Sequence, residues 1–188
     1  MKKISLIIFI AILSVLLLNC SKKQDNTQSI DGWGFANNTE SYDIGKEDEK
    51  YNGGPVYFLK SNRKVTSDFG TITKNISPVP YLGKRLKLTG FVKAENVEST
   101  AGMWMRIDST WGSGAYYKML SFDNMMNRPI KGTTDWKYYE IVLDVPNSSK
   151  IIYYGAHLNG NGELWLSGLK LDTVGTDVPT TGKDVNTK

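Results

Sequence analysis

Residues 85–94 read RLKLTGFVKA and carry the clearest alternation of side chains in the sequence. Leu86, Leu88 and Val92 fall on one face of an extended chain, while Arg85 and Lys87 fall on the other. Side chains of a β-strand point to opposite faces in turn, so one face is expected to be buried and the other to contact water. The segment therefore predicts a strand that covers one side of a folded core.

The same two-residue period recurs along the chain. It predicts strands at residues 102–108, 136–145, 151–158 and 163–174, with weaker patterns at 56–61, 69–76 and 115–122. Turn residues such as Asn159-Gly160-Asn161-Gly162 separate these segments, and no amphipathic run is long enough to predict a helix. About eight strands fit an all-β, two-sheet β-sandwich of the jelly-roll type, with a closed barrel as the alternative.

The composition is that of a single domain without cross-links. The chain has 188 residues and one cysteine, Cys20, so it can form no internal disulfide. Its 23 basic residues are interspersed with 19 acidic ones, which gives a formal net charge of +4. Nucleic-acid-binding domains gather Lys and Arg on one face, so nucleic acid is not an expected partner.

The first twenty residues read MKKISLIIFIAILSVLLLNC and resemble a bacterial lipoprotein export signal. A short basic start precedes an apolar run from Ile4 to Leu18, which is too short for a membrane-spanning helix. Leu17-Leu18-Asn19-Cys20 is similar to a lipobox, although Asn19 replaces the usual small residue. An ordinary signal peptide or an uncleaved anchor helix are the alternatives.

This resemblance implies cleavage before Cys20 and attachment of acyl chains such as palmitate to that cysteine. Several acyl chains hold a protein on a membrane durably, whereas one holds it weakly. The expected location is the bacterial cell envelope, at the outer membrane, because no Asp follows Cys20. The membrane would then be a partner through the lipid anchor alone.

The chain divides into four predicted parts. Residues 1–19 form the signal peptide, 20–30 the lipidated cysteine and a flexible tether, 31–174 the β-sandwich domain, and 175–188 a disordered tail. Residues 21–29 contain no apolar side chain, and the last segment mixes Gly, Pro, Thr, Asp and Lys without periodicity. Such segments bury too little apolar surface to offset the entropy lost on ordering.

The inventory of reactive side chains argues against most enzyme mechanisms. His157 is the only histidine, and we expect it to be exposed or half-covered on its strand; Cys20 is committed to the lipid. A Cys-His pair is therefore excluded, and no clustered His, Cys or acidic residues predict a metal site or a cofactor. A glycosidase pair of carboxylates, drawn from Asp108, Asp123, Glu140, Asp144 and Glu163, is an alternative, but we expect a non-enzyme.

Binding is the better-supported function, because aromatic residues fall on strand faces opposite the predicted core. Met103 and Ile107 are expected inside, which turns Trp104 and Arg106 outwards. The same alternation assigns ligand-binding positions to Trp136, Tyr138, Tyr153 and His157. Aromatic rings stack on sugar C–H surfaces and polar groups bond the hydroxyls, although aromatics also cover sandwich cores.

The segment 123–129, DNMMNRP, is a second candidate ligand-binding element. It concentrates Asp123, Asn124 and Arg128 between two strands, where a rigid scaffold can present loop residues. Arg128 can hold a carboxylate or a pair of hydroxyls in a forked geometry. Alternatively, Asp123 and Arg128 bond each other and fix the loop.

Residues 122–136, FDNMMNRPIKGTTDW, and residues 139–146, YEIVLDVP, resemble an uncharacterised bacterial β-sandwich domain. This domain occurs alone and beside DNA-binding regions of some transcriptional regulators. Further matches lie at residues 32–33, 42–45, 81–85, 90–94, 102–108 and 177–181. The likeness spans residues 31–181.

A more distant resemblance connects the chain to galactose-binding-like jelly rolls, which include many carbohydrate-binding modules. It rests on Asn52-Gly53-Gly54 and on Gly162-Glu163-Leu164-Trp165. Such modules often carry an acidic pair after that tryptophan, where Ser167-Gly168 stands here, so structural calcium is not expected.

Together these observations predict a membrane-anchored, non-catalytic module for a glycan or another small polar ligand. An envelope lipoprotein that binds other proteins through its aromatic residues is the first alternative. A hydrolase is the second.

Overall fold

The computed structural model describes residues 29–37, 40–62, 64, 67–109 and 118–184. These residues form ten β-strands and one short 3-10 helix, η1. The elements are β1 (Gly34–Asn37), β2 (Tyr42–Tyr51), β3 (Gly54–Ser61), β4 (Phe69–Ile76), η1 (Val79–Tyr81), β5 (Arg85–Asp108), β6 (Met119–Asp123), β7 (Ile130–Asp144), β8 (Ile151–Asn159), β9 (Glu163–Val174) and β10 (Lys183–Asp184). Nowhere in these segments is there a helix with the length and apolarity needed to cross a bilayer. The predicted signal peptide and Cys20 lie outside the described residues.

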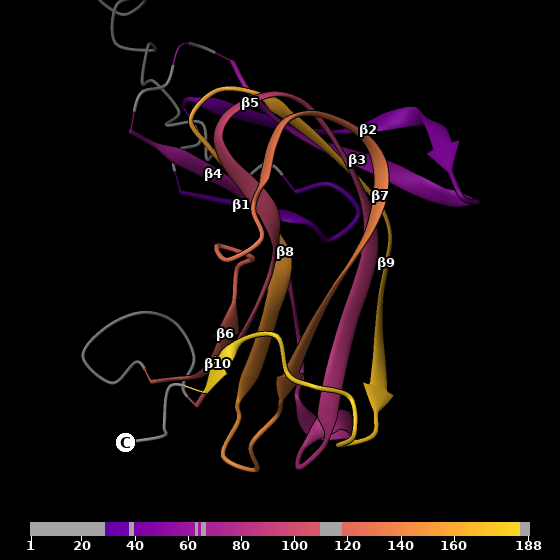
Figure 1. Cartoon of the computed structure of the whole chain (residues 1–188), viewed down its shortest axis with the longest axis vertical. Helices are drawn as coiled ribbons and strands as arrows, with labels where there is room; N and C mark the ends of the chain where they lie inside the picture. The colour runs from indigo at the N-terminus through magenta and orange to yellow at the C-terminus, as the bar shows by residue number, and fades with distance from the viewer. Residues whose placement is uncertain (1–28, 38–39, 63, 65–66, 110–117, 185–188) are drawn as a thin grey trace, which may run out of the picture.

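Strand β5 organises the domain because it belongs to two sheets. Its first half pairs with β7 and β9, and its second half, from Thr100, pairs with β8 and then β6. Sheet 1 therefore has the order β1-β4-β8-β5-β6-β10, and sheet 2 has the order β2-β3-β9-β5-β7. In Figure 1, β5 rises on one side of the molecule, curves over at the top and descends on the other.

The curvature of β5 has a local cause. Its register against β7 shifts between Val92 and Ala94, between Ala94 and Val97, and between Val97 and Ala101. Asn96, within this stretch, has a positive φ of 52°. Bulges bend a strand and increase its twist, so one continuous strand can turn from one sheet into the other.

The core lies between the two sheets and follows the predicted alternation. Leu86, Leu88 and Val92 in the first half of β5 have 0% exposure, as do Met103 and Ile107 in the second half. Each such side chain contributes ~1.5–3 kcal/mol by leaving water. The predicted all-β sandwich is confirmed, since the described strands form two facing layers rather than a closed barrel.

Several boundaries differ from the sequence prediction. The two predicted strands at 85–94 and 102–108 are one strand, because the bulged segment between them keeps its pairing with β7. Strand β7 begins at Ile130 rather than at Trp136, and β1, β2 and β10 were not predicted. The predicted pairing segment 115–122 overlaps β6 from Met119, while its first three residues lie outside the described residues.

The start of the predicted disordered tail is corrected by the structure. Arg85 Nη1 donates to the carbonyls of Thr176 and Val178, at 2.8 and 2.6 Å. Thr181 exchanges hydrogen bonds with Val142 on edge strand β7, and β10 pairs with β6. Residues 175–184 are therefore held by the Arg85 side chain and by backbone groups of β7 and β6. Val142, which alternation placed outside, is buried.

We predict that Gly155→Ala destabilises the fold, because a Cβ at Gly155 would lie 1.9 Å from the carbonyl oxygen of Ile72. A backbone atom cannot move aside cheaply, so the free energy of unfolding should fall by roughly 2 kcal/mol. Gly34→Ala is the control, since its Cβ would lie 3.8 Å from the nearest atom, the Thr73 carbonyl oxygen. Urea denaturation measures both; equal stabilities for the two variants would contradict the packing described here.

Candidate functional site

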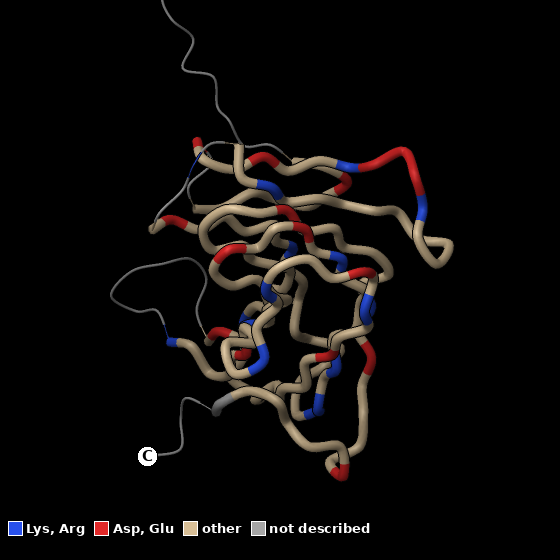
Figure 2. The backbone as a smooth tube through the Cα atoms, turned by 45° about the horizontal axis from the view of Figure 1, so that its top comes forward, with Lys and Arg blue, Asp and Glu red and all other residues tan. Residues whose placement is uncertain are grey.

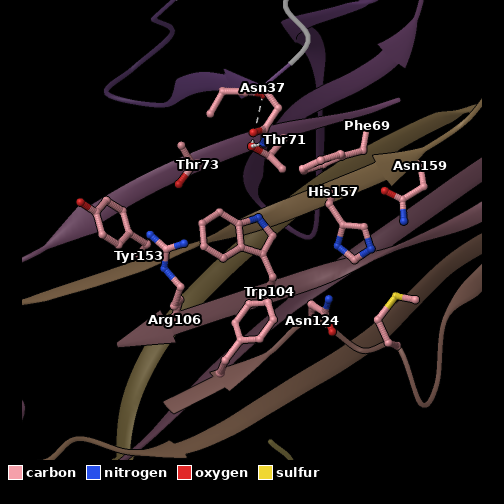
Figure 3. Close-up of a pocket in the computed structure, with 13 residues that line it drawn as sticks. Asn37, Phe69, Thr71, Thr73, Trp104, Arg106, Asn124, Tyr153, His157 and Asn159 are labelled. Carbon is pink, nitrogen blue, oxygen red and sulfur yellow. Dashed lines mark hydrogen bonds between the residues drawn. The ribbon is translucent and has the colours of Figure 1, made fainter. Parts of the chain in front are cut away.

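A cleft of about 800 Å³ lies on the outer face of sheet 1 (Figure 3). Strands β1, β4, β5, β6 and β8 line it, together with the loop that follows β6. Five of the nine predicted ligand-binding residues meet there: Trp104, Arg106, Asn124, Tyr153 and His157. Alternation in β5 and β8 predicted four of these, because both strands turn the same face outwards.

Trp104 occupies the middle of the cleft, and a glycine gives it room. In the register of β5 and β8, Trp104 lies opposite Gly155, which has no side chain. The indole therefore extends across β8 towards Thr73 of β4 (Figure 3). Its Nε1 atom is buried and has no hydrogen-bond partner among the described residues.

Arg106, Asp108 and Tyr153 form a linked group at one side of the cleft. The Arg106 Nε atom is 3.1 Å from Asp108 Oδ2, and its Cζ atom lies 5.0 Å from the centre of the Tyr153 ring. Alternation placed Asp108 on a water-facing side, but the carboxylate is completely buried. The ion pair explains this burial, since an unpaired carboxylate would be too costly to desolvate.

His157 lies beside Trp104 on the neighbouring strand. It pairs with Gly102 across β5 and β8, and only 6% of its surface is exposed. The expectation of an exposed or half-covered histidine was therefore wrong, because strand alternation does not reveal what covers a face. Burial lowers the pKa of His157 to about 4, so the imidazole is neutral at pH 7.

Hydrogen bonds to Asp123 fix the loop that follows β6, so the Asp123 carboxylate serves the loop rather than a ligand. Asp123 accepts hydrogen bonds from the Met125 amide, the Arg128 guanidinium and the Thr181 hydroxyl. Arg128 also donates to the carbonyl of Glu140 and does not line the cleft. The predicted alternative, a structural Asp123–Arg128 pair, agrees with this geometry.

Held in this way, the loop places two side chains at the cleft. Asn124 lines it directly, and Met126 lines it with 53% of its surface exposed. Met125 between them is fully buried and has a positive φ of 59°, which is uncommon for a residue with a Cβ. The strained turn thus sets the directions of Asn124 and Met126.

Trp136 and Tyr138 lie away from the cleft, on the outer face of sheet 2. Trp136 stacks on Tyr51 with ring centres 4.2 Å apart, and Tyr138 contacts Phe91 edge to face at 5.6 Å. The two-residue period fixes which face a side chain takes, but not which sheet its strand joins. These two predicted residues form a separate aromatic cluster.

Sequence reasoning missed the contribution of β1 and β4 to the cleft. Phe69, Thr71 and Thr73 come from β4, and Asn37 comes from β1. Thr71 accepts a hydrogen bond from Asn37, and Phe69 leaves 45% of its surface exposed at the rim. The two-residue period of residues 69–76 predicted strand β4. It could not predict that β4 pairs with β8, because that pairing joins segments far apart in the sequence.

The cleft carries little charge. Arg106 is the only charged side chain among the described residues that line it, and Asp108 offsets that charge. The described residues contain no group of three His, Cys, Asp or Glu that could hold a metal ion. Elsewhere, Lys and Arg are interspersed with Asp and Glu, with a short acidic run between Lys46 and Lys50 (Figure 2).

No protein-family model matches the chain. It is 36% identical over 170 residues to an uncharacterised HTH-type transcriptional regulator of Bacillus subtilis strain 168, YbfP. The match covers 88% of this chain but only 56% of the regulator, so the regulator's name describes a longer protein.

Solved structures show the same fold at low sequence identity. The enzymatically active domain of tailspike protein 4 from bacteriophage CBA120 gives a TM-score of 0.54 at 13% identity, over 78% of this chain and 20% of that one. The C-terminal family 22 carbohydrate-binding module of Clostridium thermocellum Xyn10B gives 0.51 at 14% identity, over 80% and 91%. The chain therefore has the β-sandwich fold of carbohydrate-binding modules.

We predict that acidification destabilises the protein through His157. Burial lowers the pKa of His157 to about 4, so between pH 4 and 6.5 the unfolded chain binds the proton more tightly than the folded one. Stability should therefore fall by roughly 2 kcal/mol from pH 7 to pH 5 through this group.

Denaturant titrations of wild type and His157→Gln at both pH values measure this contribution. The variant should lose less stability than wild type on acidification. Equal losses in the two proteins would show that His157 does not carry the effect.

Proposed function

We propose that this protein is a non-catalytic binding protein that takes a glycan, or another small polar ligand, into the cleft on sheet 1. The observation that carries the proposal is the convergence of Trp104, Tyr153, Arg106 and His157 on one concave face. These residues come from two adjacent strands, so the backbone pairing itself holds them in place. A rigid, preformed site loses little conformational entropy when a ligand binds.

The size and lining of the cleft suit a short stretch of sugar chain. Its volume of about 800 Å³ falls within the usual range for small-molecule sites. Trp104 and Tyr153 offer aromatic surface to sugar C–H groups, and Phe69 and Met126 add exposed apolar surface at the rim. Asn37, Asn124 and Asn159 supply amides that can bond hydroxyl groups.

The chemistry of the described lining favours binding over turnover. Glycoside hydrolysis requires two carboxyl groups flanking the bond, at ~5 to ~9.5 Å from each other. The described residues that line the cleft include no Asp or Glu. Among the predicted candidates, Asp123 and Asp144 are engaged by Arg128 and Arg85, and neither faces the cleft.

The fold likeness to a carbohydrate-binding module supports this proposal without identifying a ligand. At 14% identity it concerns the arrangement of strands, and the argument for a glycan rests on the side chains of the cleft. The match to the regulator YbfP covers 88% of this chain at 36% identity, which is compatible with a module that recognises a ligand in different settings.

We further propose that the module is held at the outside of a bacterial membrane, at the outer membrane, through lipidated Cys20. The support is the sequence of residues 1–20, with its basic start, apolar run and single cysteine. Residues 20–30 would serve as the tether between the acyl chains and the sandwich. A ligand in this setting would come from the envelope or from outside the cell.

We predict that Trp104→Ala weakens the binding of oligosaccharide by more than tenfold, about 1.4 kcal/mol, because the central stacking surface is lost. Glycan arrays followed by calorimetry measure the affinity. Trp136→Ala is the matched control, since it removes an indole from sheet 2 and should leave the affinity unchanged. Retained binding in Trp104→Ala, with loss in Trp136→Ala, would place the site on the other sheet.

We predict that Cys20→Ala releases the full-length chain from the membrane fraction of expressing bacteria. Without the thiol, no diacylglyceryl group can be attached and signal cleavage at this position should stop. Incorporation of labelled palmitate and the mass of the mature amino terminus report these steps. Palmitate labelling that persists in Cys20→Ala would contradict the anchor.

A further inference from the structure

Two buried polar atoms without partners lie on adjacent strands in the cleft. They are Nε1 of Trp104 and Nε2 of His157, and neither has a hydrogen bond to any described residue. Trp104 pairs with Gly155 and His157 pairs with Gly102, so the two side chains are diagonal neighbours on the outer face of β5 and β8. Figure 3 shows the two rings side by side, with the nitrogen edge of the indole turned towards the His157 side.

Such atoms need a partner that the described protein does not supply. Leaving a buried donor or acceptor unsatisfied costs ~1–3 kcal/mol, so native structures satisfy it with water or ligand. The indole nitrogen can only donate, while a neutral imidazole nitrogen donates or accepts according to its tautomer. A single hydroxyl group between the rings can accept from Trp104 and pair with His157 in either tautomer.

The charge of the cleft distinguishes a hydroxyl from an anion. Arg106 is the only charged residue among the described lining residues, and its guanidinium is paired with the fully buried Asp108. His157, which is 6% exposed and neutral at pH 7, adds no positive charge. A carboxylate or sulfate that enters the cleft would lose its hydration, and the cleft offers no net positive charge to compensate for that loss.

A glycine lies opposite each of the two rings in the pairing of β5 with β8. A Cβ at Gly102 would lie 3.4 Å from Cε1 of His157 and 3.1 Å from Cβ of Met125, so a side chain there would crowd the imidazole. Gly155, opposite Trp104, likewise adds no side chain to the floor. The strand partners of Trp104 and His157 therefore place no side chain against the two rings.

We propose that Trp104 and His157 together bind one hydroxyl group of an uncharged sugar residue, so that the cleft selects neutral over acidic glycans. The inference rests on the proposed glycan-binding function and adds a ligand class and two specificity-determining residues. Trp104 then has two separate roles, because its ring face stacks on the sugar while its nitrogen donates a hydrogen bond to a hydroxyl group.

The first test compares probes of similar length and different charge. Calorimetry on residues 20–188, the chain without the predicted signal peptide, measures the affinities for xylohexaose, cellohexaose and hexagalacturonate. At least one of the two neutral probes should bind, and the acidic hexagalacturonate should bind at least about tenfold more weakly. Hexagalacturonate that binds as tightly as the best neutral probe would overturn the inference while leaving glycan binding intact. No binding of any probe at millimolar concentration would overturn the proposed function and the inference together.

The second test separates the two roles of Trp104. Trp104→Phe retains an aromatic face and loses the N–H, and His157→Phe retains a ring and loses the nitrogens. Each substitution should lower the affinity for the neutral probe that binds most tightly about tenfold. Trp165→Phe is the control, because the Trp165 nitrogen donates to Glu47 on sheet 2 at 3.0 Å. Wild-type affinity in Trp104→Phe, with binding lost in Trp104→Ala, would retain the stacking site and refute the hydroxyl contact.

An NMR measurement on the wild-type protein tests the inference without any substitution, so the result does not depend on whether a variant folds. In a ¹⁵N-labelled sample, the indole N–H resonance of Trp104 should shift on addition of the neutral probe, while that of Trp165 should stay in place. A Trp104 resonance that does not move at saturating probe would show that the nitrogen meets only water, and would overturn the inference.

Discussion

The two-residue alternation in each half of one continuous strand, with bulges between the halves, is the constraint on which this structure depends. Strand β5 runs for 24 residues through both sheets, so it fixes their relative position and supplies both with core side chains. In its second half, Met103, Met105 and Ile107 enter the core while Trp104 and Arg106 turn into the cleft. A shift of one residue would reverse both sets, and the loss of buried apolar surface opposes such a slip.

The cleft is rigid because the hydrogen bonds that stabilise the fold also hold the residues that line it. Trp104, Arg106, Tyr153 and His157 stand on paired strands, and Asn124 follows a turn that Asp123 ties down through Met125, Arg128 and Thr181. Thr181 comes from the C-terminal segment that covers β7, so the packing of that segment also supports the site. Pre-organisation of this kind lets stacking and a few hydrogen bonds yield measurable affinity.

The sequence allowed the faces of the strands to be predicted, but not their neighbours. Alternation placed Trp104, Arg106, Tyr153 and His157 on outward faces, and the structure brings these four residues together. The same rule gave Trp136 and Tyr138 an outward face, yet β7 belongs to sheet 2 and they lie elsewhere. The burial of Asp108 and His157, and the role of β4, depend on contacts between distant segments, which local periodicity does not encode.

The central claim is that the cleft on sheet 1 receives a neutral sugar, and a structure of the complex tests it most directly. Crystals of the mature domain grown with the neutral oligosaccharide that binds most tightly should show a sugar ring against Trp104. One hydroxyl of that ring should lie within hydrogen-bonding distance of both Trp104 Nε1 and His157 Nε2. A sugar bound instead beside Tyr51, Trp136 and Tyr138 on sheet 2, with the cleft empty, would contradict the account.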